Sequence, residues 1–346
     1  AQAPGKDFTT WDLTRLFAEI DQQFTKALAA EKELKAIPIA AYDELLVKGT
    51  LPDAYRPTLY DFIAHEALAF YTSGEQAAAK PEDAFEVPAD SPIFDAAEKF
   101  IAWQPATTQT DSPALKAVKL YEELLRFHQN DAEPSALLDT DLARLVWAKN
   151  VAFGESKNAR FKEAMKPLAD KWGDHDLASL ALSHWASVVH EEDDFVQARE
   201  LAQRGRNAHP NSPGGKLCAN LIAQIEAKSA NIQTERIWNA SWPNISVHYR
   251  NVTNVFFRAI AWDWDDFLQK RHNRPERLSE QERKQVLAKA PALEWSHALP
   301  PTTDYKERAD VRARRIKVLE AAHRKMLKGE AENQRNLALW QKVSNL

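Results

Sequence analysis

The chain has 346 residues, of which 44% are hydrophobic and 27% charged, and its formal net charge is −5. These values are typical of a globular protein with a sizeable core, and the negative charge gives no electrostatic reason to expect a nucleic acid partner. No apolar run reaches the roughly 18 residues that a membrane-spanning helix needs. With only 9 glycines, phosphate-binding loops and dinucleotide folds are disfavoured, and we predict no cofactor.

The first residues read AQAPGKDF. An Ala-x-Ala-Pro start of small residues is typical of a chain after signal peptidase cleavage, so we expect a mature exported protein, periplasmic or secreted. The single Cys218 cannot form an internal disulfide, so cysteine usage does not identify the compartment. We interpret Cys218 as a small, buried apolar residue.

Residues 1–112 predict an N-terminal helical region. Apolar residues follow helical spacing from Leu13 to Leu28, and a second helix is expected from Pro57 to a stop at Gly74. The stretches 77–92 and 104–113 contain several prolines and no periodicity, which is typical of loops.

From residue 113 to residue 230 the helical pattern becomes regular. Helices are predicted at about 113–127, 137–152, 157–171, 176–190, 195–208 and 212–228. The spacing suggests a repeat, because Phe161 and Ala164 recur 34 residues later as Phe195 and Ala198. This is the period of the tetratricopeptide repeat, and we predict tetratricopeptide-like helical hairpins.

The second copy of the repeat carries the clearer pattern. Small residues at Ala198, Ala202 and Gly205 allow two antiparallel helices to approach closely, and Pro210 ends the second helix. The predicted structural positions of the repeat are Phe161, Ala164, Phe195, Ala198, Ala202, Gly205 and Pro210.

Residues 190–194, His-Glu-Glu-Asp-Asp, form the most metal-like cluster. A helical zinc site requires a second histidine where Asp194 stands, so we interpret the cluster as a solvated turn in which Asp193 or Asp194 caps the next helix. His65 and Glu66 also lack a second ligand, because Ala69 stands where it would be, and His65 is expected to be a hydrogen-bonded packing residue on an otherwise apolar helix. No Gly-x-Ser-x-Gly motif is present. We predict no catalytic, cofactor-binding or metal-binding residue and a protein that is not an enzyme.

A different composition begins near residue 231, and 231–310 predicts a small β-containing module. Ile245, Val247 and Tyr249 alternate with polar residues, as in a half-buried strand, and 255–262 is a second apolar strand. A polar turn joins them, so we predict a β-hairpin. The predicted core of the module is Trp238, Trp242, Val247, Tyr249, Phe257 and Trp262. The alternative for the tryptophans is a platform that stacks on sugars or peptides.

Two helical segments accompany this module. Residues 263–290 predict a helical insertion with a capping box at Ser279 and Glu282. Residues 311–346 predict a basic helical tail, and 308–328 is far richer in Lys and Arg than in acidic residues. This segment is either a solvated amphipathic helix or a surface for an anionic partner such as lipid, nucleic acid or an acidic protein.

Four segments, 53–71, 195–228, 235–260 and 298–310, together resemble the N-terminal region of large bacterial alpha-2-macroglobulin-like proteins. The resemblance implies a helical, repeat-like region followed by the start of the first macroglobulin-type β-domain. It further implies an extracytoplasmic protein related to protease-trapping inhibitors. The chain departs from the family pattern, because Cys218 is followed by Ala219 and Asn220 instead of completing a Cys-Gly-Glu-Gln thioester motif. No bait region is recognisable, and a basic helix stands where further strands are expected.

We therefore expect a non-enzymatic scaffold or recognition portion of an alpha-2-macroglobulin-like protein, with a protein or peptide as partner. The alternative is a free-standing tetratricopeptide-like adaptor that binds its partner along a groove formed by residues 113–228. A hydrolase with a dispersed active site is the third reading.

Overall fold

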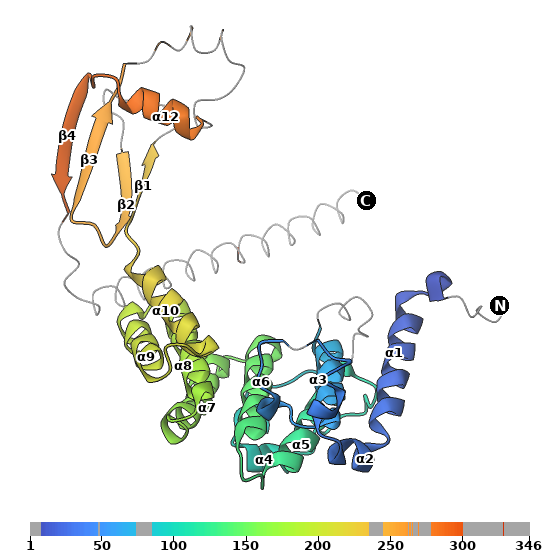
Figure 1. The fold of residues 1–346 in the computed structure, drawn as a ribbon. Helices are drawn as coiled ribbons and strands as arrows, with labels where there is room; N and C mark the ends of the chain where they lie inside the picture. The colour runs from blue at the N-terminus through green and yellow to red at the C-terminus, as the bar shows by residue number, and fades with distance from the viewer. Residues whose placement is uncertain are drawn as a thin grey trace, which may run out of the picture. The chain divides into compact units, whose positions relative to one another are not determined.

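The computed structural model describes residues 8–47, 49–73, 85–234, 245–261 and 278–299, together with the single residues 263, 265, 269 and 328. The chain divides into two compact units, Ala1–Ile225 and Glu226–Leu346 (Figure 1). Unit 1 is built from helices, and the described strands all lie in unit 2. The prediction of a predominantly α-helical protein with a small β-containing part is confirmed. No helix in the described ranges has the length and apolar character required to cross a membrane.

The helices of unit 1 are joined by short connections after residue 113 and mostly by longer ones before it. They are α1 (Leu13–Leu28), α2 (Glu31–Ala36), α3 (Leu59–Thr72), α4 (Ala97–Ile101), α5 (Pro113–His128), α6 (Ser135–Val151), α7 (Lys157–Lys171), α8 (Asp176–Glu191), α9 (Phe195–Ala208) and α10 (Pro213–Glu226). Short 3-10 helices lie at Phe8–Thr10, Ile39–Tyr42, Asp53–Tyr55 (η3) and Pro92–Phe94. All helices predicted between 113 and 228 are present, and their ends differ from the prediction by at most two residues.

Helix α3 begins later than its sequence suggested. Thr58 is its N-cap and Asp61 completes a capping box, because each side chain accepts a hydrogen bond from the backbone N–H of the other residue. Pro57 therefore precedes the helix, and the predicted start at Pro57 is wrong. The predicted loop at 104–113 is confirmed up to Ser112. Ser112 is the N-cap of α5, and the helix begins at Pro113. Part of the other predicted loop, 77–84, lies outside the described residues.

The larger hydrophobic core of unit 1 joins α3, α5 and α6. Its fully buried side chains include Tyr60, Phe100, Leu124, Leu125 and Leu145. Members of this core come from both sides of residue 112, so residues 1–112 share one core with the helices that follow. Helix α1 has no fully buried residue and packs on α3 through aromatic contacts.

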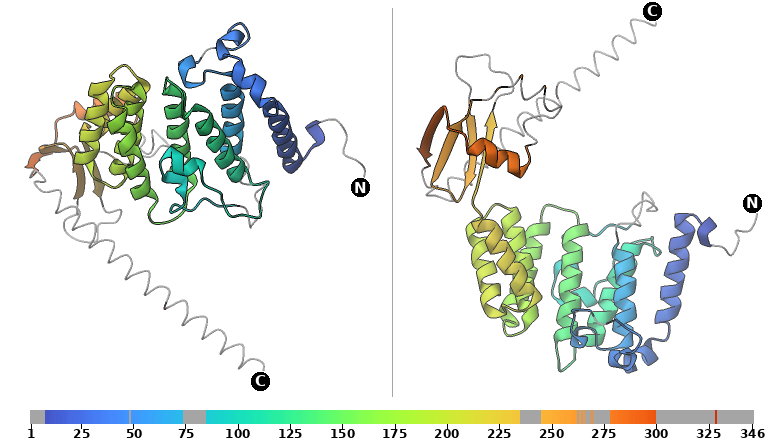
Figure 2. Two further views of the ribbon diagram at one scale, coloured as in Figure 1. Left: turned by 90° about the horizontal axis from the view of Figure 1, so that it is seen from below. Right: turned by 45° about the horizontal axis from the view of Figure 1, so that its top comes forward.

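The second core of unit 1 joins α8, α9 and α10, which lie side by side in both views of Figure 2. At Gly205 of α9 an added Cβ atom would lie 2.6 Å from Cys218 Sγ and 3.2 Å from Leu182 Cβ. Ser179 donates a hydrogen bond to the carbonyl of Gly205 at 2.9 Å. The absence of a side chain at Gly205 therefore permits α8, α9 and α10 to approach closely. The sequence pattern predicted such an approach for two helices, and the structure shows it for three.

The described residues of unit 2 contain four strands in two antiparallel sheets. Strand β1 (Ser229–Thr234) pairs with β2 (Ile245–Arg250), and β3 (Asn254–Ala259) pairs with β4 (Leu293–Ala298). The predicted hairpin between 245–250 and 255–262 is wrong, because β2 and β3 pair with other strands. The register explains the choice: Val247 lies opposite Ile232, and Phe257 lies opposite Trp295 with the two rings stacked at 4.9 Å. Apolar alternation predicted β2 and an apolar run predicted β3, but neither pattern carried information about the partner strands. Strands β1 and β4 were not predicted.

The predicted core of the β-module is less buried than expected. Val247, Tyr249 and Phe257 are half-buried, and among the described residues of the strands only Val255 is fully buried. Trp238, Trp242 and Trp262 lie outside the described residues. Helix α12 (Glu280–Leu287) confirms the predicted capping box, in which the side chains of Ser279 and Glu282 accept from each other's backbone N–H groups. The basic tail, 311–346, lies outside the description except for residue 328, which is helical.

Candidate binding groove

The predicted repeat positions take structural roles. Ala198 and Ala202 are fully buried on α9, and Phe161 is buried on α7. Ala164 and Phe195 are half-buried and pack against the cores. The remaining two positions are Gly205, at the contact of α8, α9 and α10, and Pro210, exposed just after α9 ends. None of these residues presents a reactive group, so the repeat pattern defines packing and not chemistry.

The acidic cluster at 190–194 forms the turn between α8 and α9. The side chain of Asp194 accepts a hydrogen bond from the backbone N–H of Gln197 at 2.9 Å and thereby caps α9. Glu191 forms an ion pair with Lys149 of α6, and Glu192 forms one with Lys162 of α7. In the part of the chain that the structure describes, no group of His, Cys, Asp and Glu could hold a metal ion. The interpretation as a capped turn is confirmed.

Ser135, His175 and Asp176 form an arrangement that resembles a catalytic triad and that sequence reasoning missed. Nε2 of His175 lies 2.8 Å from Ser135 Oγ, and Nδ1 lies 3.2 Å from an Asp176 carboxylate oxygen. However, Nδ1 accepts the backbone N–H of Leu177 at 3.2 Å, which leaves the ring proton on Nε2. Nε2 therefore donates to Ser135, whose hydroxyl donates to Glu133 at 2.6 Å. With these donor directions His175 cannot accept the serine proton.

A buried histidine, His128, joins α3 to α5. His128 is 1% exposed, and its two ring nitrogens lie 2.7 Å from carboxylate oxygens of Asp61 and Asp131. Both nitrogens donate only when the ring is protonated. Burial by itself lowers the pKa of His128, but the hydrogen bonds and charges of Asp61 and Asp131 outweigh burial and raise it. These contacts join α3 to α5 and to the turn that follows α5.

Unit 1 contains a cavity of about 430 Å³, which we call the polar pocket. It is formed by the C-terminal end of α3 with α5, α6 and α8. Its polar side chains include Tyr121, Asp139, Asn150 and His184, and its apolar side chains include Leu142, Val146, Trp147 and Leu180. Burial, and then the charge of Lys149, lower the pKa of His184, so this histidine is neutral at pH 7. No Lys or Arg lines the pocket among the described residues.

Asp139 is the charged residue of the polar pocket. Its side chain is 13% exposed, and one carboxylate oxygen lies 3.7 Å from Nε of Arg56, which comes from the segment after η3. This ion pair is too long for a hydrogen bond, and neither of the two atoms has a hydrogen-bond partner within the described ranges. Burial raises the pKa of Asp139 although Arg56 acts in the opposite direction. The carboxylate is therefore only partly compensated.

An adjoining cavity of about 630 Å³, the aromatic pocket, lies between α1, the end of α3, the start of α5 and the end of α6. Its aromatic side chains are Phe17, Phe70, Tyr71, Phe85, Trp147 and Phe153. At one edge Asp21 of α1 accepts from Lys116 of α5 at 2.7 Å and from the hydroxyl of Tyr71 at 2.8 Å. These two contacts attach α1 to the helices beneath it.

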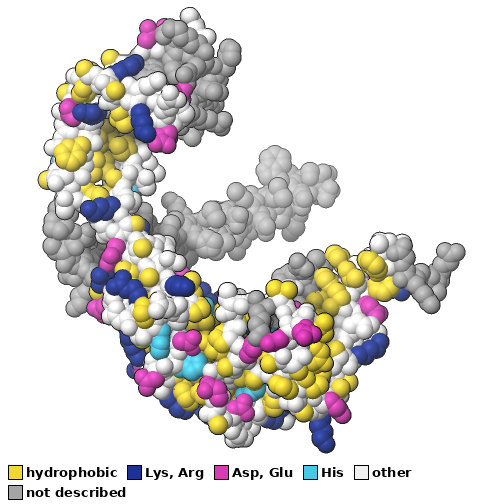
Figure 3. All heavy atoms as spheres, viewed as in Figure 1, with side chains coloured by type: hydrophobic (Ala, Val, Ile, Leu, Met, Phe, Trp, Pro, Cys, Tyr) yellow, Lys and Arg dark blue, Asp and Glu magenta, His cyan; other side chains and the backbone are white. Residues whose placement is uncertain are grey.

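The two pockets form one groove, because Thr72, Trp147 and Val151 line both. Val151 is 43% exposed and Phe153 is 52% exposed, so apolar surface is open to solvent along the groove. In the space-filling view, hydrophobic side chains gather over α1 and α3, whereas acidic and histidine side chains gather over α6 and α8 (Figure 3). Exposed apolar surface beside polar side chains is typical of an interaction site.

The groove residues carry no sequence motif. Asp139, Ala143, Val146 and Asn150 recur at helical spacing and lie on one face of α6, which is the only signal that could have found them. These residues lie within 113–228, the range in which the sequence predicted a groove. The aromatic half is supplied mainly by residues before 113, which the prediction did not include.

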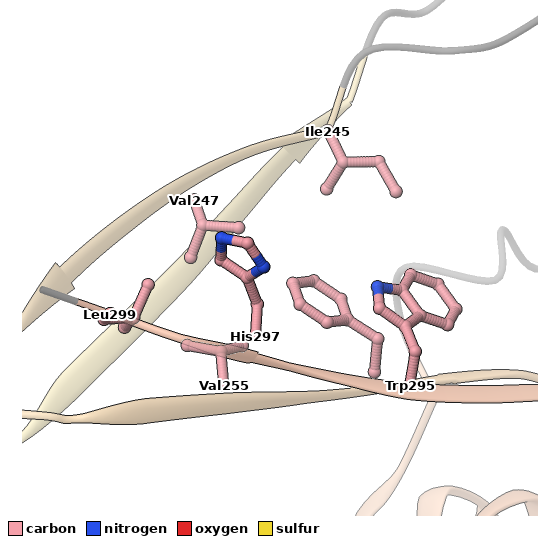
Figure 4. Close-up of a pocket in the computed structure, with 7 residues that line it drawn as sticks. Ile245, Val247, Val255, Trp295, His297 and Leu299 are labelled. Carbon is pink, nitrogen blue, oxygen red and sulfur yellow. The ribbon is translucent and has the colours of Figure 1, made fainter.

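Unit 2 has an apolar face of its own (Figure 4). Ile245 and Val247 of β2 lie near Val255, Trp295 and His297 of the other sheet, around a cavity of about 270 Å³. Among the residues that the structure describes, no Asp, Glu, Lys or Arg lines this cavity. This face resembles one side of a core, since two-stranded sheets require a covering surface for stability.

Comparison with known proteins adds no assignment: no family model matches the chain, and no curated protein or solved structure matches it either.

Proposed function

We propose that this chain is a non-enzymatic recognition scaffold whose helical unit binds an extended segment of another protein in the groove. The observation that carries the proposal is the continuity of the polar and aromatic pockets through Trp147 and Val151. Together they offer apolar anchoring space and a few fixed polar groups, which is the composition of binding sites. A serine hydrolase is not supported, because Nε2 of His175 donates to Ser135 and so cannot take the proton of the serine hydroxyl.

The arrangement of α6 to α10 is, in this proposal, tetratricopeptide-like. Support comes from the 34-residue recurrence of Phe161 as Phe195 and from the close contact at Gly205. A second close contact lies at Gly214 of α10, where an added Cβ would overlap the backbone of Leu180 in α8. Stacked helical repeats distribute binding over an extended surface instead of a single deep pocket.

For the biological context we propose an extracytoplasmic alpha-2-macroglobulin-like protein in which this chain is the N-terminal scaffold. The resemblance of the four sequence segments supports this context, as does the order of a helical unit followed by a strand-containing unit. The gene sequence beyond residue 346 tests it. A reading frame that continues into further β-domains is expected, and a stop codon directly after Leu346 would favour the free-standing adaptor.

The groove itself is tested with peptides selected from a random display library against the full chain. Val151→Trp fills the junction of the two pockets from an exposed position, so it should abolish binding of the selected peptides. Val196→Trp is the matched control, because Val196 is 57% exposed on α9 and lines neither pocket. Peptides that bind wild type and Val151→Trp with equal affinity would show that the groove is not the binding site.

A further inference from the structure

The polar pocket is lined by one charged side chain among its described residues, and this bears on the class of ligand that it could take. In the polar pocket Asp139 is the charged side chain, His184 is neutral, and no Lys or Arg lines the cavity among the described residues. An anionic group that entered would meet the Asp139 carboxylate, because Arg56, which pairs with Asp139, does not itself line the pocket. A cation would meet Asp139, whose carboxylate oxygen near Arg56 has no hydrogen-bond partner. A carboxylate accepts about four hydrogen bonds, so Asp139 has capacity for a second cation beside Arg56.

The walls of the polar pocket fit the rest of such a ligand. The rings of Tyr121 and Trp147 lie 5.7 Å apart, and Leu142 and Val146 add aliphatic surface. Lys and Arg side chains have apolar stems that pack on such surfaces, and their charged groups are attracted to aromatic faces. Trp147 also lines the aromatic pocket, so a ligand that continues past it reaches a cavity with space for a large apolar side chain.

The chain itself contains an example of this recognition. Tyr55 and Arg56, at the end of η3, pack against the α6 and α8 side of unit 1. Tyr55 donates a hydrogen bond to Asp176, and Arg56 pairs with Asp139. An aromatic residue next to a basic residue is thus already accommodated by carboxylates of these helices.

We propose that the groove recognises a protein segment in which a Lys or Arg side chain enters the polar pocket toward Asp139 and a nearby large apolar side chain fills the aromatic pocket. This inference rests on the proposed function and adds the chemistry of the partner. It predicts that acidic or uncharged polar segments are discriminated against, since they leave Asp139 without a second cation.

The test uses the full chain and capped peptides that contain one Arg and one Trp, separated by glycine spacers of different lengths and in both orders. Binding is measured by fluorescence anisotropy. For the best spacing, replacement of Arg by Gln should weaken binding about tenfold or more, and replacement of Trp by Ala should weaken it to a similar extent. In Asp139→Asn the Arg and Gln peptides should bind alike. Asp170→Asn, an exposed carboxylate on α7 that pairs with Arg204, is the matched control and should retain the preference.

Three results separate the inference from the proposed function. Equal affinity of the Arg and Gln peptides for wild type, or a preference that survives in Asp139→Asn, overturns the inference. If those peptides still lose binding in Val151→Trp, the groove function stands without its charge selectivity. If no peptide of the series or of the selected library binds, the proposed function fails as well. Should Asp139→Asn not fold, the comparison of Arg, Gln and Glu peptides on wild type and Val151→Trp still decides the question.

Discussion

Gly205 and Gly214 of unit 1 occupy positions where a methyl group has no room. At Gly205 the nearest atom to an added Cβ is the side-chain sulfur of Cys218, and at Gly214 it is the backbone of Leu180. A side chain can shift by rotation, whereas a backbone atom moves only with its helix. Burial raises the pKa of the Cys218 thiol to about 11, consistent with its expected role as an apolar packing residue.

Gly205→Ala should therefore destabilise unit 1 by about 1–3 kcal/mol, despite the higher helix propensity of alanine. Gly214→Ala should cost more, because α10 must move away from α8. Gly173→Ala is the control, since its added Cβ would make only an ordinary contact at 3.7 Å. Urea unfolding followed by circular dichroism measures all three. Equal midpoints for Gly205→Ala and Gly173→Ala would contradict the close packing of the three helices.

The His128 cluster predicts a pH-dependent contribution to stability. The pKa of His128 is raised above its ordinary value of 6.5 in the folded protein, so the folded state binds the proton more tightly than the unfolded state. Its stabilisation is fully present below pH 6.5 and is lost as the pH rises through the folded-state pKa. His128→Gln should lower the free energy of unfolding by about 3 kcal/mol in the acidic range and by less at alkaline pH. An equal loss across the pH range would contradict a charged His128.

His65 acts in the opposite direction. Burial, and then the charge of Arg56, lower the pKa of His65 to about 3, so the unfolded state binds its proton first on acidification. Stability is therefore lost between pH 6.5 and 3. His65→Leu should reduce this loss, measured as the change in unfolding free energy between neutral and acidic pH. An unchanged acid sensitivity in this variant would mean that His65 is accessible to protons in the folded protein.

At the scale of elements, the strands of unit 2 show that a sequence pattern can predict a strand without predicting which other strand it pairs with. The cross-strand pair Ile232 and Val247 brings β1 to β2, although β1 has a weak apolar pattern. The stacked pair Phe257 and Trp295 joins β3 to a strand more than thirty residues away in the chain. Contacts of this kind stabilise a sheet only when both partners are present, so they are invisible in either segment alone.

Cysteine pairs test this register directly. Ile232→Cys combined with Val247→Cys should cross-link under mild oxidation, because directly opposed residues have Cβ atoms about 5 Å apart. Ile232→Cys combined with His248→Cys is the control, since neighbouring residues in a strand point to opposite faces. Mass spectrometry after digestion detects the cross-link. Equal yields from the two pairs would contradict the register of β1 and β2.

At the scale of the whole molecule, the two units differ in how much core they contain. Both hydrophobic clusters lie in unit 1, whereas the described part of unit 2 has one fully buried side chain, Val255. A fragment of residues 1–228, which keeps α10 intact, should unfold cooperatively with strong helical circular dichroism. A fragment of residues 229–346 should show no cooperative transition, because two-stranded sheets are marginal in water. A cooperative transition in the second fragment would show that residues outside the described ranges complete its core.

Much of unit 1 was determined by the sequence itself. Helices α5 to α10 follow from local apolar spacing, N-cap residues and breaks at proline, and Gly205 was expected at a helix contact. These features act over a few residues, so they remain visible in a linear chain. The same holds for the capping box at Ser279 and Glu282.

The tertiary structure alone decided which distant residues meet. Asp139 and Trp147 lie on an ordinary helical segment, and they became parts of a groove only when α3 and α8 packed beside α6. The partners of β2 and β3 were decided in the same way, by Ile232 and Trp295. Local propensity acts between near neighbours in sequence. These contacts instead depend on packing between segments that are far apart in the chain, and nothing in either segment alone indicates that the two will meet.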